Sequence, residues 1–409
     1  MGAGVVGVTT AYELAKDGHE VSVIEAREAA GLETSWGNAG MVAPGHAFAW
    51  SSPAAPMILL KSLLSKNQAL RFRPRADPQQ WSWSLLFLRQ CTQERARVNT
   101  LRKHRLCLYS QAVLHETLKD CALDYDRIDR GIVFFYRSPE RLEEGVSHMR
   151  ILAEDGQAIE VLDRNGLIAL EPSLAAAKDR IAGGIYCPSD ETGDCSKFTQ
   201  GLAERAADLG AAFHYGTEIA GIEAEGDKIA RVATSKGDFT AEAYVLALGN
   251  GSAVLARRLG INLPIYPVKG YSLTIPVGNH PHPPTIGAVD EENLIAISRF
   301  GDRMRLTATA EISGYGTGHK PRDFDYMLSV ASELYPEGGD YDGAEPWAGL
   351  RPMTPEGTPI FGRKRYRNLY FNCGQGHMGW TMAHGSARIT ADLIAGKDPA
   401  IPLDGMTIN

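Results

Sequence analysis

Several features that would place the chain in a special class are missing from its 409 residues. No run of eighteen apolar residues is present, so no segment could cross a bilayer as a helix. Six cysteines are scattered without a C-x-x-C pair, which argues against a structural zinc site or a disulfide framework and suits a reducing compartment. No Ser-His-Asp group, carboxylate pair or metal-ligand cluster stands out, so we expect no metal. What remains is an ordinary globular composition, 44% hydrophobic and 22% charged, whose length favours two packed domains.

The net charge of -7 conceals a basic segment. Between Met57 and Arg105 the chain has eleven Lys or Arg residues against two acids, Asp77 and Glu94. The acidity of the rest disfavours nucleic-acid binding. Large apolar side chains lie between these cations: Leu59, Leu60, Leu63, Leu64, Trp81, Trp83, Leu85, Leu86 and Phe87. This pattern fits the surface of an anionic bilayer, and it fits equally well a helical subdomain with a core and a solvated basic face.

The first twenty-five residues contain a dinucleotide-binding pattern. Gly2, Gly4 and Gly7 are spaced G-x-G-x-x-G, a helical segment follows over residues 8–17, and the strand at 21–24 ends on Glu25. Glycines at these positions allow a tight turn and a close approach to a pyrophosphate at a helix N-terminus, while the acid binds a ribose hydroxyl. The spacing therefore predicts a nucleotide site.

The pattern also requires a strand before the first glycine, where only Met1 stands. That strand normally lies at the centre of a doubly wound sheet. We therefore expect the natural polypeptide to begin about five to eight residues upstream, with a strand of the Val-Ile type. The alternative is a truncated chain that binds no cofactor and has no activity.

A second glycine-rich turn lies near the C-terminus. The strand at 369–372 leads into Gly374, Gly376 and Gly379, again spaced G-x-G-x-x-G, then Thr381 and a helix to residue 395. No strand ending in an acid follows, so this turn is better suited to the far end of the first cofactor than to a second dinucleotide. FAD has the required length. Small polar residues after the first strand, and the end of the buried strand at 243–250, are expected to lie along it: Thr34, Ser35, Asn38, Ala39, Gly40 and Gly249.

The order of strand and helix signals predicts an α/β fold. A Rossmann-type FAD-binding domain, apparently without its first strand, would carry an inserted α+β substrate domain on a mixed or antiparallel sheet. We assign residues 1–45, 185–260 and 345–409 to the FAD-binding domain. Residues 46–184 and 261–344 are assigned to the substrate domain, which includes the basic helical part at 57–105.

Five segments of the chain resemble one family. They are the turn at 2–7, the loop at 33–40, Ser189-Asp190-Glu191-Thr192-Gly193-Asp194-Cys195, Tyr266-Pro267-Val268-Lys269-Gly270-Tyr271 with its continuation to Pro276, and Gly349-Leu350-Arg351-Pro352-Met353-Thr354-Pro355. Together they resemble the bacterial D-amino acid dehydrogenases (small subunit), within the D-amino acid oxidase-like FAD family. The resemblance covers residues 1 to about 402 and implies oxidation of D-amino acids, D-alanine above all, to 2-oxo acids and ammonia. It also implies that electrons leave to a membrane quinone.

The candidate substrate residues follow from the substrate's carboxylate. Arginine grips a carboxylate bidentately and would fix the Cα–H bond against flavin N5, so the protein itself needs no acid or base. Arg351 is the leading candidate, and similar proteins place an arginine in this motif; Arg299 is the runner-up. Tyr271 could donate its hydroxyl to the carboxylate, although a core role is nearly as plausible. The resemblance places His377 near the flavin ring, and His46 is a weaker candidate.

Other functions remain open at this stage. The substrate could be D-proline or cis-4-hydroxy-D-proline, and the enzyme could be an oxidase that uses O2. An NAD dehydrogenase is disfavoured, because no ribose-binding acid follows the second turn. No secretory signal is visible, so we expect a location in the cytoplasm or peripherally on the inner face of the cytoplasmic membrane.

Overall fold

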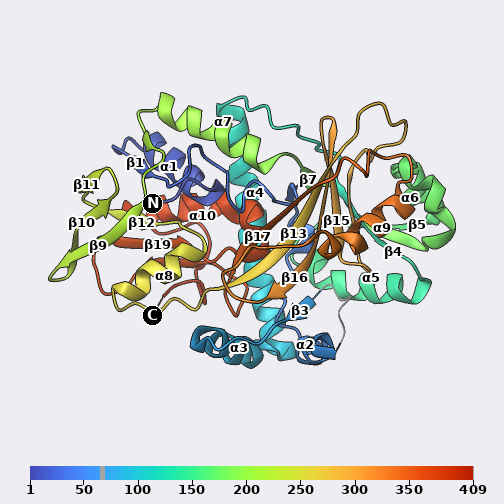
Figure 1. The fold of residues 1–409 in the computed structure, drawn as a ribbon, viewed down its shortest axis with the longest axis horizontal. Helices are drawn as coiled ribbons and strands as arrows, with labels where there is room; N and C mark the ends of the chain where they lie inside the picture. Colours follow the sequence, from blue (N-terminus) through green and yellow to red (C-terminus); the bar gives the residue numbers. More distant parts are fainter. Residues whose placement is uncertain (65–69, 409) are drawn as a thin grey trace.

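The computed structural model describes residues 1–64 and 70–408 (Figure 1). Small sheets and the helices α1, α7, α8 and α10 lie at one end of the molecule, and a large sheet with α5, α6 and α9 lies at the other (Figure 1). The long helix α4 (Gln93–Asp120) runs between the two ends, and α2 and α3 lie together at the lower edge (Figure 1). This arrangement confirms an α/β fold with mixed sheets.

The nucleotide end is built from short parallel strands covered by helices. Strand β1 (Ser22–Ile24) pairs in parallel with β8 (Ala212–His214), and β12 (Tyr244–Leu246) pairs in parallel with β19 (Leu369–Cys373). Helix α1 (Val5–Lys16) packs against α10 (Gly379–Ile394) and α7 (Cys195–Asp208). Smaller elements complete this end: α8 (Asn250–Arg258), β18 (Ile360–Arg363), β9 (Ile219–Glu225), β10 (Lys228–Thr234) and β11 (Gly237–Phe239).

Met1 and Gly2 lie between the two parallel pairs. The Met1 amino group donates to the carbonyl oxygen of Val245 at 3.0 Å, and the amide of Ala247 donates to the Met1 carbonyl at 3.1 Å. On the other side, the Gly2 amide donates to the Ile24 carbonyl at 2.9 Å. These two residues therefore connect the edge of β1 to the edge of β12. The predicted upstream strand is not tested by these contacts and stays a prediction.

The other end is one large sheet. Its strand order is β17-β13-β16-β15-β14-β4-β6-β5, with β3 pairing alongside β16. The bounds are β3 (Leu70–Phe72), β4 (Ile132–Tyr136), β5 (Glu160–Asp163), β6 (Gly183–Cys187), β13 (Tyr266–Pro276), β14 (Gly287–Asp290), β15 (Ile295–Phe300), β16 (Arg303–Ile312) and β17 (Glu345–Met353). One face packs against α9 in the main core, which includes Leu273, Ile297, Leu306 and Met327. The other face is turned toward the loop at 36–40.

Two of the predicted domain boundaries are misplaced. The boundary at 185 cuts through β6, and the boundary at 345 assigns β17 to the FAD-binding domain, yet these strands pair with β4 and β13 in the large sheet. The boundaries were drawn from local motifs, whereas strand pairing decides membership of a sheet. The remaining division stays a proposal.

Several further helices and turns connect these parts. They are η1 (Pro44–His46), α2 (Ala55–Leu64), α3 (Pro78–Gln90), α5 (Pro139–Glu154), α6 (Arg164–Leu170), η2 (Pro172–Arg180), η3 (Pro321–Asp323), α9 (Asp325–Leu334) and η4 (Gly376–Met378), together with the short pair β2 (Met41–Val42) and β7 (Glu191–Thr192). Helix α3 begins at Asp77, whose carboxylate accepts from the Gln79 amide at 2.9 Å as an N-cap.

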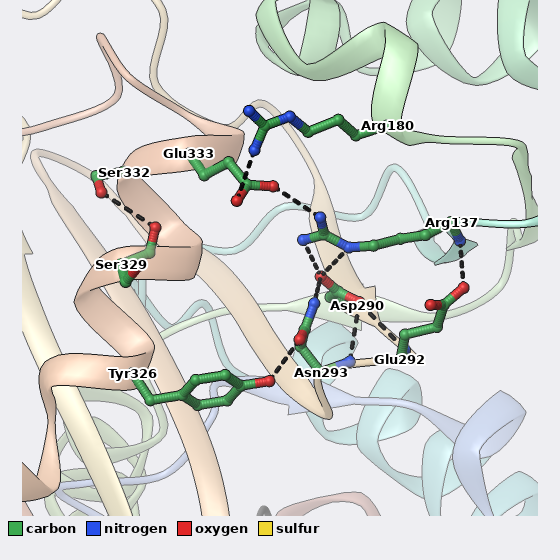
Figure 2. A network of polar contacts seen from close by, with 9 residues as sticks. All are labelled: Arg137, Arg180, Asp290, Glu292, Asn293, Tyr326, Ser329, Ser332 and Glu333. Atoms are coloured by element: carbon green, nitrogen blue, oxygen red, sulfur yellow. Dashed lines mark hydrogen bonds and ion pairs between the residues drawn. The ribbon is translucent and has the colours of Figure 1, made fainter. Parts of the chain in front are cut away.

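An ionic network centred on the buried Asp290 ties α9 to the far end of the large sheet (Figure 2). Asp290, fully buried, accepts from the Arg137 guanidinium at 2.6 Å and from the Asn293 amide at 2.7 Å. Arg137 also bonds Glu333 at 2.7 Å, and Arg180 bonds the second oxygen of Glu333 (Figure 2). Because several partners satisfy each buried charge, the network fixes how strand ends and helix meet.

Candidate functional site

The first glycine turn is built so that only glycine fits at two of its positions. Gly2 has a φ of +94°, and a Cβ there would lie 2.6 Å from the carbonyl oxygen of Ala247. At Gly7 a Cβ would lie 1.9 Å from the Gly2 carbonyl oxygen. Gly4 is the N-cap of α1 and has no side chain to cap it. Ser35 Oγ accepts from the Val5 amide, and the rest of the helix N-terminus can face an anion. This is the geometry of a pyrophosphate site.

Glu25 is held against this turn by two backbone amides. Its Oε2 accepts from the Ala3 amide at 2.7 Å, and its Oε1 accepts from the Arg27 amide at 2.9 Å. Each carboxylate oxygen keeps a further lone pair, so both can accept from ribose hydroxyls. The predicted ribose-binding acid thus lies beside the predicted phosphate turn.

The loop at 34–40 joins this turn to the large sheet. Ser35 Oγ accepts from the Val5 amide at 3.0 Å, Asn38 Oδ1 accepts from the Gly40 amide at 2.7 Å, and Thr34 Oγ1 donates to the Leu350 carbonyl at 3.0 Å. Ala39 lies within the same loop, partly buried. Each predicted loop residue therefore lies on a path from the α1 N-terminus toward β17.

A buried arginine fixes the other side of this loop. Arg305, on β16, donates to the Trp36 carbonyl at 2.7 Å and to the Asn38 carbonyl at 3.2 Å. Burial lowers the pKa of Arg305 to about 10. At Gly40, with φ +73°, a Cβ would lie 2.1 Å from the Phe300 ring, so the loop backbone packs directly on the sheet. Sequence reasoning missed Arg305, since nothing in its spacing marks it.

The second glycine turn sits between β19 and α10. Gly374 and Gly376 have φ values of +81° and +61°, and Gly379 is the first residue of α10. Thr381 accepts from the Ala43 amide at 3.1 Å and donates to the Met41 carbonyl at 3.3 Å, which ties the start of α10 to β2. The two turns are held near one another because α1 and α10 pack together.

Strand β12 ends beside the first glycine turn. Gly249 has φ +54° and serves as N-cap of α8, and a Cβ there would meet no atom within 4 Å. The next residue, Asn250, donates to the Leu350 carbonyl at 3.0 Å. The Leu350 carbonyl also accepts from Thr34. Strand β17, the loop at 34–40 and the start of α8 therefore meet at this carbonyl.

Buried polar atoms without partners test whether FAD fits here. Within the described part of the chain, hydrogen-bond partners are missing for Asn250 Oδ1, Ser272 Oγ, Ser298 Oγ, Arg305 Nε and His377 Nε2. Ser298 pairs with Arg305 across two antiparallel strands, so their side chains share the sheet face turned toward the loop at 36–40. A flavin, with its many donors and acceptors, would satisfy such groups. The residues therefore fit the cofactor.

Arg351 points from β17 across Gly270 on the neighbouring strand. A Cβ at Gly270 would lie 2.5 Å from the Arg351 Cζ, so only glycine leaves room for the guanidinium. Nη1 donates to the Thr309 carbonyl at 2.9 Å, and no described carboxylate forms an ion pair with it. Burial lowers the pKa of Arg351 to about 10. A partly buried cation without a counter-ion is costly, and a substrate carboxylate would supply the missing charge.

His377 and Arg351 both lie close to the Trp50 ring. The Trp50 ring stacks on the His377 ring with centroids 4.5 Å apart, and the Arg351 Cζ lies 6.0 Å from the Trp50 centroid. The His46 ring meets His377 edge-on at 6.5 Å. Burial first, then the cations Lys103 and Arg351, lower the pKa of His377 well below its ordinary value, so the imidazole is neutral. The structure thus groups Arg351, His377 and His46.

Tyr271 and Arg299 are not part of this group. Tyr271 pairs with Ala348 on the face opposite Gly270, where it joins the main core and contacts Glu311 through its hydroxyl at 3.3 Å. Arg299 neighbours Ser298 on β15 and so points to the other face, where its Nε donates to the Gly301 carbonyl. Both predictions are corrected by strand alternation, which places successive side chains on opposite faces.

The structure thus brings together a glycine-rich turn at α1, an acid on its ribose side and a second turn at α10. Over the sheet lies Arg351, which forms no ion pair with any described carboxylate. Such a site is typical of a flavoprotein oxidoreductase. The chain matches the family described as "DAO: FAD dependent oxidoreductase" over residues 1–393, and it belongs to that family. Its cofactor is FAD. Of the described helices, none is both long and apolar enough to cross a membrane, and the described residues contain no cluster of three or more potential metal ligands.

Two curated relatives align over nearly the full length. "D-amino acid dehydrogenase 2" of Mesorhizobium japonicum is 47% identical over 99% of this chain and 98% of its own. "D-amino acid dehydrogenase" of Paramagnetospirillum magneticum is 45% identical over 100% of this chain and 97% of its own. These matches confirm the resemblance seen in the sequence.

Solved structures agree on the fold. Glycine oxidase from Geobacillus kaustophilus superposes with a TM-score of 0.77 at 23% identity, covering 100% of this chain and 96% of its own. Iminodiacetate oxidase from Chelativorans sp. gives a TM-score of 0.75 at 19% identity, covering 99% and 97%. At this identity the likeness establishes architecture alone.

Proposed function

We propose that the protein is an FAD-dependent dehydrogenase that oxidises D-amino acids, D-alanine first among them, to the 2-oxo acid and ammonia. The observation that carries the proposal is Arg351, a partly buried guanidinium without a described carboxylate partner, on the sheet face that the cofactor residues share. The names of the two relatives support the D-configuration and a dehydrogenase rather than an oxidase.

The residues of the site explain what the protein adds to the cofactor. Bound FAD would accept the hydride from the substrate's Cα. Arg351 keeps N–H donors free besides the Nη1 that Thr309 engages, so it can hold the carboxylate while Thr309 fixes its plane. His377, neutral and buried, neither repels the substrate's ammonium nor competes for its carboxylate. Positioning and exclusion of water are then the protein's contributions.

A panel of substrates tests the proposal. The FAD-loaded protein is mixed without oxygen with D-alanine, L-alanine, D-proline and cis-4-hydroxy-D-proline, and flavin absorbance is followed. We expect D-alanine to bleach the flavin at least tenfold faster than L-alanine. Reduction by the cyclic substrates alone would replace D-alanine with a cyclic amino acid, and no reduction by any of them would end the proposal.

We propose a quinone as the electron acceptor. A short-chain ubiquinone analogue should reoxidise the reduced flavin faster than air-saturated buffer does, with little hydrogen peroxide formed. Peroxide equal to the substrate consumed would instead make the enzyme an oxidase.

We further propose that α2 and α3 attach the protein peripherally to an anionic membrane. Met57, Leu60 and Leu85 are 56%, 57% and 60% exposed, and Ile58, Trp81 and Leu88 are also exposed on the same two helices. Lys61 and Arg89 accompany them, and both helices lie at one edge of the molecule (Figure 1). Residues 65–69 of the basic segment lie outside the described residues. Exposed apolar side chains beside cations suit the interface of an anionic bilayer.

Vesicle sedimentation tests the membrane proposal. Wild-type protein should sediment with vesicles of phosphatidylcholine and phosphatidylglycerol more than with phosphatidylcholine alone. The double variant Leu60→Ser, Leu85→Ser should lose most of this binding while it keeps D-alanine turnover with a soluble dye. Equal binding by wild type and variant would show that the exposed face serves another purpose.

A further inference from the structure

Residues 45–50 lead up to Trp50, which lies close to Arg351. Side chains from other parts of the chain bind the backbone of this segment. The Ala49 amide donates to Thr100 Oγ1 at 3.0 Å, and the Phe48 carbonyl accepts from the buried Lys103 ammonium. Thr100 and Lys103 lie three residues apart, on one face of α4. Thus α4 holds the backbone on the N-terminal side of Trp50.

A third anchor holds the start of the same segment. The Gly45 amide points at the Asp190 carboxyl, 3.2 and 3.3 Å from its two oxygens, and the Gln157 amide donates to the same group at 3.2 Å. A Cβ at Gly45 would lie 2.6 Å from Cys187 Sγ, so the backbone is packed closely there. Residues 45–50 are therefore held at both ends.

Lys103 is an unusual residue for a purely structural anchor. Its side chain is fully buried, and within the described residues its ammonium forms no ion pair. A buried ammonium without a counter-ion costs stability, while a neutral donor could serve a carbonyl at lower cost. Lys103 nevertheless places a positive charge near His377 and holds the Phe48 carbonyl in one orientation. This indicates that the charge and the bond serve the site and not only the fold.

The Trp50 ring lies next to the side chain proposed to bind the substrate's carboxylate. It stacks on the His377 ring at 4.5 Å between centroids, and the Arg351 Cζ lies 6.0 Å from the Trp50 centroid. An amino acid whose carboxylate binds Arg351 has its Cα one bond away from that group, so its remaining substituents meet the wall formed by these rings. The size of the indole ring at this position limits the volume left for the substrate's side chain.

We propose that Trp50 determines which side-chain sizes the enzyme accepts and orients Arg351, and that Thr100 and Lys103 are positioning residues for it. The inference rests on the proposed function in taking Arg351 as the carboxylate clamp. Removing the indole should raise the KM for D-alanine while it opens space for larger substrates. Shortening a hydrophobic wall changes such preferences by about 10- to 200-fold.

Two measurements test the proposal on the FAD-loaded full chain. The first is the ratio of kcat/KM for D-phenylalanine to that for D-alanine, with a soluble dye as acceptor. Trp50→Ala should raise this ratio at least tenfold, Trp50→Phe less than threefold, and Trp81→Ala on the exposed face of α3 should leave it unchanged. An unchanged ratio in Trp50→Ala with a normal flavin spectrum overturns the proposal.

The second measurement needs no turnover, so it separates this inference from the proposed function. Benzoate binding is followed through the flavin absorbance change. Trp50→Ala should weaken it at least tenfold, and Thr100→Val at least threefold, whereas Thr100→Ser keeps the hydroxyl and should bind like wild type. Lys103→Met should weaken benzoate in the same direction as Thr100→Val. Wild-type affinity in Trp50→Ala and Thr100→Val overturns the positioning role. Failure of the proposed function would instead appear as benzoate binding without reduction by any D-amino acid.

Discussion

Replacing Arg351 with Met should move activity and stability in different directions. Truncating one member of a buried charge pair costs about 2–5 kcal/mol. If the substrate carboxylate is the partner of Arg351, kcat/KM for D-alanine should therefore fall roughly 30-fold to several-thousand-fold, at about tenfold per 1.4 kcal/mol.

The effect on folding follows from the same burial. Burial lowers the pKa of Arg351 to about 10, so the folded protein disfavours the charge by roughly 3 kcal/mol at most. Met would remove that cost but leave the Thr309 carbonyl without its 2.9 Å donor, a loss of about 1–3 kcal/mol. The free energy of unfolding in the absence of substrate should thus remain near the wild-type value or rise by up to about 2 kcal/mol.

The assay pairs anaerobic flavin reduction by D-alanine with urea denaturation of the same preparations. Arg299→Met is the matched control, because Arg299 points to the other sheet face and its kcat/KM should stay within about twofold. A structural ion pair at Arg351 would behave differently, since breaking one costs about 3–5 kcal/mol of stability. Destabilisation of that size, with activity largely kept, would show that Arg351 is a structural ion-pair partner and not the carboxylate-binding residue.

Three further substitutions test separate parts of the structure. Glu25→Gln should weaken FAD binding about 10- to 100-fold by flavin fluorescence titration, because Glu25 accepts charge-assisted bonds from two amides, whereas the exposed Glu28→Gln should not. Asp290→Asn should lower the free energy of unfolding by about 3–5 kcal/mol, because it breaks the network around the buried Asp290 in Figure 2; a loss below 1 kcal/mol would contradict that role. Burial lowers the pKa of Lys103 from 10.5 to about 8, so the unfolded chain binds more protons between these values and wild-type stability should rise with pH in this window relative to Lys103→Met, as measured by denaturation at about pH 7.5 and pH 9.5.

The nucleotide end could be predicted from sequence because its signals are local. Backbone clashes require glycine at positions 2 and 7, and Glu25 stands at a fixed spacing after them, so a few residues define the turn, the helix and the ribose-side acid. The second turn is similarly local. In each case chemistry and geometry are encoded within one strand–helix unit.

The substrate side could be predicted only in part, because it is assembled from segments far apart in sequence. Arg351 was found through its motif, but which face of the sheet Tyr271 occupies depends on the register of β13 against β17. Trp50 and Lys103 carry no local signal, since a tryptophan or a lysine near a helix is common and only tertiary packing brings them to His377. The predicted domain boundaries at 185 and 345 are misplaced for the same reason, because β6 and β17 join the large sheet by pairing with strands distant in sequence.

A crystal structure of the FAD-loaded protein with bound benzoate would test the central claim most directly. We expect the FAD pyrophosphate at the α1 N-terminus, the flavin ring against the turn at α10, and the benzoate carboxylate within hydrogen-bonding distance of Arg351. A carboxylate bound elsewhere, for example at Lys269 on the opposite sheet face, with Arg351 still bonded only to Thr309, would contradict it.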